Sequence, residues 1–224
     1  MSGTLFIVAT PIGNLGDITL RALETLKRVD VIACEDTRQT SKLLTHYDIR
    51  KPLISLHDHN ERQRAPELIE RLHSGQSVAL VSDGGTPLVN DPGWWLVHCA
   101  LAAALPVEWL PGAAAFVGAL VLSGLAVDRF IFEGFLPQKP GARRQRLEGL
   151  KRESRTAMFY ESPHRLLKTL RDIRDVLGDL PMCCARELTK KFEEVRRGSA
   201  AELITHFEQH APRGEFVIVI SNQR

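Results

Sequence analysis

The stretch SVALVSDGGTP, over residues 77–87, indicates how this chain folds. Its first half is a short apolar run, typical of a buried strand, and its second half is a loop with an aspartate, two glycines and a proline. The same order of apolar run and Gly/Pro-rich or polar loop recurs at residues 5–9, 29–34, 52–56 and 106–110. We therefore expect five strands in the first half of the chain, each followed by a loop.

Helical segments separate these strands. Leu20, Leu23 and Leu26 form one apolar stripe of a helix, for which Asp17 or Thr19 is the expected N-cap. Residues 61–73 predict another helix, which stops before Gly75, where a left-handed helix end is usually placed. Alternating strands and helices indicate an α/β fold whose parallel strands are joined by helical crossovers.

The pattern changes after Ala126. The expected strands are residues 130–133, 156–160, 182–186, 192–196 and 216–220, and the expected helices are residues 141–152, 163–177 and 200–209. Two of these strands follow each other with no helix between them, which implies antiparallel pairing. We therefore predict a parallel-sheet α/β domain over residues 1–118 and a mixed-sheet α/β domain over residues 119–224.

Composition and charge narrow the class of protein only slightly. The 224 residues are 44% hydrophobic and 25% charged, with a formal net charge of +2, so RNA binding is permitted but a dedicated basic binder is not indicated. The four cysteines lack zinc-ligand spacing, so we expect no metal and no disulfide framework. The first apolar run is too short for a signal peptide or membrane span, so we expect a cytoplasmic protein without a membrane segment.

Three of the loops predict a ligand cleft. They cover residues 10–17, 82–93 and 110–115, and each follows a predicted parallel strand. Ligands bind at the carboxyl edge of such sheets, where loop amides and helix N-termini converge. No loop matches the dinucleotide or Walker phosphate signature, and each alone is also compatible with an ordinary turn.

Eight motifs make the chain similar to the class III, tetrapyrrole-methylase-like methyltransferases, and within them to the ribosomal RNA small subunit methyltransferase I family. They are ATPIGNL (9–15), ACEDTR (33–38), VSD (81–83), GTP (85–87), DPG (91–93), FEGFLP (132–137), YESPHR (160–165) and RELTK (186–190). The resemblance implies a two-domain tetrapyrrole-methylase-like fold with S-adenosyl-L-methionine in the cleft between the domains, usually in a homodimer. It also implies 2′-O-ribose methylation of a cytidine in the decoding region of 16S ribosomal RNA, with that RNA or the 30S subunit as partner.

The resemblance also supplies candidate cofactor residues. They are Pro11, Gly13, Ser82, Asp83, Gly84, Gly85, Pro87, Pro111, Gly112, Ala114, Ala115 and Phe135. Gly84 stands where alanine is usual, and Ala113 and Ala114 replace a usual Pro-Ser or Pro-Cys pair. These changes keep the loops small but remove one hydroxyl or thiol contact.

A ribose hydroxyl becomes a good nucleophile when its proton is removed, so the predicted reaction calls for a general base. The candidates are Glu35 and Asp36, at the end of the second strand, and Glu187. The sequence does not choose among them, and ion pairing within residues 35–38 is an alternative role for the first two.

Candidate RNA contacts are basic residues. Arg38, Arg165 and Lys190 belong to the family motifs, while Arg143, Arg144 and Arg146 lie in residues 139–155, which hold seven basic residues against two acids. Such a segment suits phosphate binding, although the solvated face of a helix has the same pattern.

Two other functions compete with this reading. One is a small-molecule or protein methyltransferase of the same superfamily, for instance acting on a corrin precursor or a modified histidine. The other is a non-catalytic RNA-binding assembly factor. The ACEDTR and YESPHR motifs and the basic segment favour the ribosomal RNA branch.

Overall fold

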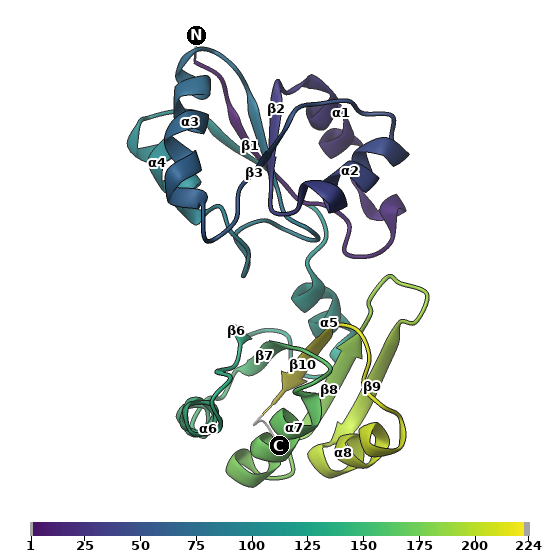
Figure 1. The fold of residues 1–224 in the computed structure, drawn as a ribbon. Helices are drawn as coiled ribbons and strands as arrows, with labels where there is room; N and C mark the ends of the chain where they lie inside the picture. Colours follow the sequence, from purple (N-terminus) through teal and green to yellow (C-terminus); the bar gives the residue numbers. More distant parts are fainter. Residues whose placement is uncertain (1, 222–224) are drawn as a thin grey trace. The chain divides into compact units, whose positions relative to one another are not determined.

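The computed structural model describes residues 2–221, which form two compact units (Figure 1). The N-terminal unit is Met1–Ala114 and the C-terminal unit is Ala115–Arg224. This division lies four residues before the predicted boundary at 118/119. It places the helix that follows the last N-terminal strand with the second sheet.

The N-terminal unit is a five-stranded parallel sheet between two pairs of helices. Its strands, in the order β3-β2-β4-β1-β5, are β1 (Leu5–Val8), β2 (Val31–Cys34), β3 (Leu53–Ser55), β4 (Val78–Val81) and β5 (Val107–Leu110). Helices α1 (Leu20–Arg28) and α2 (Thr37–His46) cover one face, and α3 (Glu61–His73) and α4 (Trp94–Ala102) cover the other. A 3-10 turn, η1 (Leu15–Asp17), precedes α1.

Burial on both faces explains why the first strands read as continuous apolar runs. Along β1, Phe6 packs with α1 and α2 while Leu5 packs with α3 and α4. Of the two N-caps considered for α1, Thr19 is used, because its hydroxyl accepts the Ala22 N–H at 3.1 Å. Gly75 has the expected left-handed conformation after α3, with φ 92°.

The sequence did not predict α2 or α4. Helix α2 is rich in polar and β-branched residues and buries only Thr40, Leu43 and Leu44, so its apolar stripe is short. Helix α4 has the opposite composition: its sequence WWLVHCALA is apolar on all sides and carries no helical period.

The C-terminal unit is a mixed five-stranded sheet in the order β6-β7-β10-β8-β9. Its strands are β6 (Phe130–Phe135), β7 (Thr156–Glu161), β8 (Pro181–Arg186), β9 (Glu194–Ser199) and β10 (Phe216–Ile220), and its helices are α5 (Ala115–Ser123), α6 (Pro140–Gly149), α7 (Leu166–Leu177) and α8 (Ala200–Gln209). The β6/β7 pair is parallel and the other three pairs are antiparallel, including the β8/β9 hairpin that the sequence predicted.

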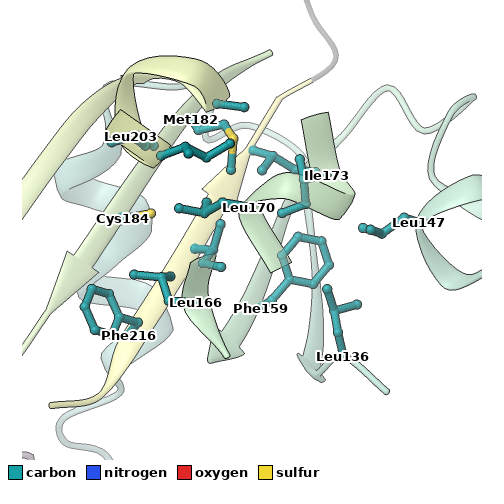
Figure 2. Close-up of a cluster of buried hydrophobic side chains, with 14 of the residues drawn as sticks. Leu136, Leu147, Phe159, Leu166, Leu170, Ile173, Met182, Cys184, Leu203 and Phe216 are labelled. Carbon is teal, nitrogen blue, oxygen red and sulfur yellow. The ribbon is translucent and has the colours of Figure 1, made fainter. Parts of the chain in front are cut away.

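One apolar core fills the space between this sheet and helices α6, α7 and α8 (Figure 2). Phe159 and Phe216 come from the strands, Leu147 from α6, Leu170 from α7 and Leu203 from α8. Helix α5 contacts β7, β8, β9 and β10. Cys183 and Cys184 are buried in β8.

Several predicted boundaries in this unit were wrong by two or three residues: β6 ends at Phe135 and not at residue 133, α6 at Gly149 and not at 152, and β9 at Ser199 and not at 196. Strand β9 begins at Glu194 and not at residue 192, because residues 187–193 close two consecutive turns, with Lys190 N–H on Glu187 O at 3.0 Å and Glu193 N–H on Lys190 O at 3.1 Å. Helix α7 begins at Leu166 and not at residue 163, since residues 162–165 form a turn.

Residues 2–221 contain no helix long and apolar enough to cross a membrane. Within the same range, no group of three or more His, Cys, Asp or Glu side chains is arranged to hold a metal ion.

Candidate functional site

The three loops singled out in the sequence meet at the carboxyl edge of the N-terminal sheet. Thr10 and Gly85 exchange two backbone hydrogen bonds, at 2.8 and 2.9 Å. The Thr86 hydroxyl donates to Ala113 O at 3.0 Å, and the Thr10 hydroxyl donates to Ser82 O at 3.3 Å. The loops after β1, β4 and β5 therefore form one connected rim.

Glycine lets these loops approach one another closely. A Cβ on Gly112 would lie 2.7 Å from Ala9 Cβ, and one on Gly84 would lie 3.3 Å from Pro11 O. The sequence analysis named Gly84 as a candidate cofactor residue. In the structure this glycine is exposed and also packs closely against the loop after β1.

The rim exposes only some of the predicted cofactor residues. Gly13, Asp83, Gly84, Pro111 and Gly112 are exposed, and Pro11 and Ala114 are half-buried. Ser82, Gly85 and Pro87 are buried in the loop after β4, so their cofactor contacts stay a prediction. Ala115 and Phe135 lie in the C-terminal unit.

Asp36 is fully engaged in holding its own loop. Its carboxylate caps α2 by accepting the Arg38 N–H at 2.8 Å, and it pairs with the exposed Arg38 guanidinium at 2.7 Å. Its backbone N–H donates to Asp83 Oδ1 at 3.0 Å, which ties the loop after β2 to the loop after β4. The hydrogen bonds from Arg38 lower the pKa of Asp36 to about 2.

Glu35 has a different environment, although it is the next residue along the chain. It is half-buried and makes no hydrogen bond or ion pair with any side chain of residues 2–221. Burial raises the pKa of this carboxyl, the charges of Asp83 and Asp58 raise it further, and His57 opposes them. Glu35 is therefore the more basic of the two carboxylates.

Asp91 joins this acidic rim and was not predicted as a site residue. Burial raises its pKa to about 6, and the charges of Glu35 and Asp83 add to the effect, while a hydrogen bond from Ser82 opposes it. The residues before it are strained, with φ 71° at Leu88 and 68° at Asn90. The Asn-Asp-Pro order indicated a turn, but nothing in it showed that the carboxyl is buried.

Glu187, the third candidate base, is also engaged in a loop, in the C-terminal unit. Its Oε1 accepts the Lys190 ammonium at 3.0 Å and the Glu215 N–H at 3.1 Å. Burial alone would raise its pKa, but these two hydrogen bonds lower it below the ordinary glutamate value. Lys190 is correspondingly occupied by Glu187 and by Glu215, at 3.1 Å.

Ion pairs neutralise most of the basic segment 139–155. The pairs formed by the segment's basic residues are Arg143 with Asp172, Arg144 with Asp172 and Asp175, Arg146 with Glu133, Lys151 with Glu148, and Arg155 with Glu153. The Arg143 side chain is only 4% exposed, so its burial is incompatible with the predicted phosphate contact. Arg144 and Arg146 remain half exposed.

Arg165 and Phe135 shape the turn at the end of β6. The Arg165 guanidinium donates to Leu136 O at 2.7 Å and pairs with Glu161 at 3.3 Å. A bulge between Phe132 and Phe135, with Gly134 at φ 62°, places Phe135 opposite Tyr160 in the ladder. Phe135 is half exposed, whereas the Arg165 guanidinium donates a hydrogen bond to a backbone carbonyl.

Comparison with known proteins identifies the family. The tetrapyrrole (corrin/porphyrin) methylases match residues 4–204. The chain belongs to this family. A relative from Synechocystis sp., named ribosomal RNA small subunit methyltransferase I, is 52% identical and aligns with 98% of this chain and 79% of its own length. A relative of the same name from Thermotoga maritima is 48% identical over 99% of each chain.

Solved structures confirm the tetrapyrrole methylase fold. Diphthine synthase superposes with a TM-score of 0.75 at 16% identity, covering 98% of this chain and 90% of that one. A cobalt precorrin-4 methyltransferase gives a TM-score of 0.72 at 16% identity, covering 97% and 94%. At this identity the likeness shows the fold alone.

Tetrapyrrole methylases use S-adenosyl-L-methionine, and the N-terminal rim fits that molecule. The cofactor carries a sulfonium and an ammonium cation, and the rim gathers the carboxylates of Glu35, Asp83 and Asp91, with Asp58 close enough to raise the pKa of Glu35 and of Asp91. Arg38, which follows the loop after β2, is paired with Asp36. Exposed backbone at Gly13, Gly84 and Gly112 leaves amides and carbonyls open to a ligand.

Proposed function

We propose that this chain methylates the ribose 2′-hydroxyl of a cytidine in the decoding region of 16S ribosomal RNA. The observation that carries the proposal is the near-full-length identity of about 50% with relatives named ribosomal RNA small subunit methyltransferase I. The acidic rim also supports the proposal, because its carboxylates suit a cationic methyl donor. When bound, S-adenosyl-L-methionine supplies an electrophilic methyl group.

Glu35 is the proposed general base. A base must be free to take a proton, and its efficiency increases as its pKa approaches the working pH. The pKa of Asp36 is near 2 and that of Glu187 is lowered, whereas that of Glu35 is raised and its carboxylate has no cationic partner among the described residues. Glu35 thus combines a strand-end position with the highest proton affinity of the three candidates.

Asp36 and Asp83 are proposed positioning residues. The Asp36 amide held by Asp83 fixes the peptide that follows Glu35, and the Asp36 carboxylate fixes the start of α2. Glu35 is therefore presented from a backbone that is held at the residue after it. Such preorganisation lowers the cost of aligning a base with its substrate.

RNA contacts are proposed for the exposed cations. Arg38 is 86% exposed, and Arg144 and Arg146 keep half of their side-chain surface open beside their acidic partners. Arg143 is left out because it is buried. The homodimer and the cytoplasmic location remain expectations from the family, and sedimentation of the purified chain tests the first.

The decisive experiment incubates the full chain with labelled S-adenosyl-L-methionine and small ribosomal subunits, and then maps the methylated nucleotide. Glu35→Gln is expected to reduce the methylation rate by about two to four powers of ten while leaving cofactor affinity within a few-fold. Glu70→Gln, an exposed glutamate on α3, is the matched control and should retain full activity.

Three outcomes would contradict the proposal. Label on a base instead of a ribose would overturn the ribose chemistry. Label on a corrin precursor or on a protein histidine, with none on the subunits, would favour the other methyltransferase classes. Cofactor binding without any transfer would favour an RNA-binding assembly factor.

A further inference from the structure

The tip of the β8/β9 hairpin is a hydrogen-bonded loop that exposes an aromatic ring. The tip comprises residues 187–193, and Phe192 at its far side is 64% exposed. Neither the family motifs nor the proposed catalytic rim gives this ring a role. The tip lies wholly within the C-terminal unit (Figure 1).

Backbone strain and internal hydrogen bonds fix the shape of the tip. Glu187 and Thr189 have positive φ angles of 49° and 65°, which are unfavourable for residues with a Cβ. The Thr189 N–H donates to the Glu193 carboxylate at 2.6 Å, which closes the loop. Strain of this kind persists only where surrounding contacts hold it, and it is common at ligand-binding sites.

The base of the tip is anchored on two sides. Glu187 bridges Lys190 and the Glu215 N–H, and Gly214 passes so close that a Cβ there would lie 2.3 Å from Glu187 Oε1. Leu188 is buried, and its Cδ1 lies near Gly118 of α5. Phe192 is therefore presented by a fixed frame.

The tip holds two lysines and two glutamates, and Lys191 is its free cation within residues 2–221. Lys190 is paired with Glu187, whereas Lys191 makes no ion pair within residues 2–221. Its ammonium lies 5.6 Å from the centre of the Phe192 ring. The ammonium lies over one face of the ring, and the side chain is 64% exposed, so the opposite face is the one offered for stacking. An exposed aromatic ring with a cation next to it is the combination that binds single-stranded nucleic acid, because the ring stacks on a base and the cation meets the phosphate.

We propose that the hairpin tip binds an unpaired nucleotide of the RNA substrate, with Phe192 stacked on its base and Lys191 on its phosphate. This inference rests on the proposed function, because it takes the substrate to be RNA. It adds a contact remote from Glu35 along the chain, and one that acts on affinity. The contact requires an unstacked base, so it is specific for single strands.

The test measures the affinity of the full chain for small ribosomal subunits, for a single-stranded RNA oligonucleotide and for a duplex of the same sequence. Phe192→Ala is expected to weaken binding to the subunits and the single strand roughly 5- to 100-fold and to leave duplex binding unchanged. Phe192→Trp should restore the affinity, whereas Phe192→Leu, which keeps apolar bulk without a π face, should not. Lys191→Gln should reduce the salt slope by about one.

Val127→Ala is the matched control, because Val127 is a 54% exposed apolar residue in a loop of the same unit. Unchanged affinity of Phe192→Ala for the single strand would overturn the inference. Unchanged RNA affinity with a changed sedimentation coefficient would also overturn it, and would make the tip a protein contact. If the wild-type chain methylates no ribosomal RNA, the proposed function fails. If it does methylate but Phe192→Ala binds normally, only the role of the tip fails.

Discussion

Replacing Arg143 by Met is expected to destabilise the C-terminal unit without weakening RNA binding. The Arg143 guanidinium reaches Asp172 Oδ2 through Nε at 2.7 Å and Nη2 at 2.6 Å, and Nη1 donates to Gln138 O at 3.2 Å. The two side chains are 4% and 8% exposed. Removing one partner of a buried ion pair costs about 3–5 kcal/mol, because the other charge remains buried.

The lower end of that range, about 3 kcal/mol, is expected for Arg143→Met. Arg144 Nε stays 2.7 Å from Asp172 Oδ1 and continues to compensate part of its charge. Adding Asp172→Leu should recover most of the loss, since apolar residues of similar volume often replace a buried pair at little cost. In the double variant, Asp172→Leu removes an ion-pair partner from Arg144 alone. Arg144 is half exposed and keeps a second partner in Asp175.

Urea unfolding followed by circular dichroism, together with hydrogen exchange, measures the stability loss of Arg143→Met in the C-terminal unit. All three tryptophans, at positions 94, 95 and 109, lie in the N-terminal unit, so their fluorescence does not report directly on the substitution. Faster exchange in α6 and α7 and a lower circular-dichroism midpoint are expected. An unchanged midpoint, or a salt slope of RNA binding that falls by about one, would refute the assignment of Arg143 to the core.

Two further predictions concern the N-terminal rim. Because the folded-state pKa of Asp91 is raised to about 6 from an ordinary 3.8, the folded state binds this proton more tightly, and stability should fall as pH rises between 4 and 6. Asp91→Asn should flatten that part of the urea-midpoint profile, and an identical slope in the variant would contradict the assignment. Gly112→Ala should cost about 1–3 kcal/mol in urea unfolding because its Cβ meets Ala9 Cβ at 2.7 Å. Gly141→Ala on α6 has open space and should change stability by less than about 1 kcal/mol, so equal losses at the two sites would count against the packing argument.

The sequence predicted the sheets well because burial leaves a local signal. A strand of a covered parallel sheet is apolar at every position, as in β1, β2 and β4, and a loop must follow it. Helix α4 shows the limit of the same rule, because an element that is apolar all round has no period to detect. Phe192 caused the opposite error. As an apolar residue next to β9 it was predicted to begin that strand, but it is exposed in the turn before it.

The site was predicted less completely because charge states depend on partners that are distant in sequence. That three loops meet at one edge follows from parallel strand order alone. That Arg143 is buried depends on Asp172, which is 29 residues away, and the burial of Ser82 and Gly85 depends on how the loops after β1 and β4 pack together. Motif positions name these residues without showing which way they face.

The division of roles among the acidic residues determines how their variants must be interpreted. Asp36 and Glu187 each hold a loop through a cation two or three residues ahead, Arg38 and Lys190, so removing either carboxylate changes the shape of a loop as well as a charge. A loss of activity in Asp36→Asn or Glu187→Gln is therefore expected whether or not the group accepts a proton. Glu35 has no such partner within the described residues, and its raised pKa places its titration nearer to neutral pH. The acid limb of the rate profile separates the candidates when Asp91→Asn is measured beside them, because the charge of Glu35 also raises the pKa of Asp91. A limb that Glu35→Gln abolishes, and that Asp36→Asn and Asp91→Asn both preserve, belongs to Glu35.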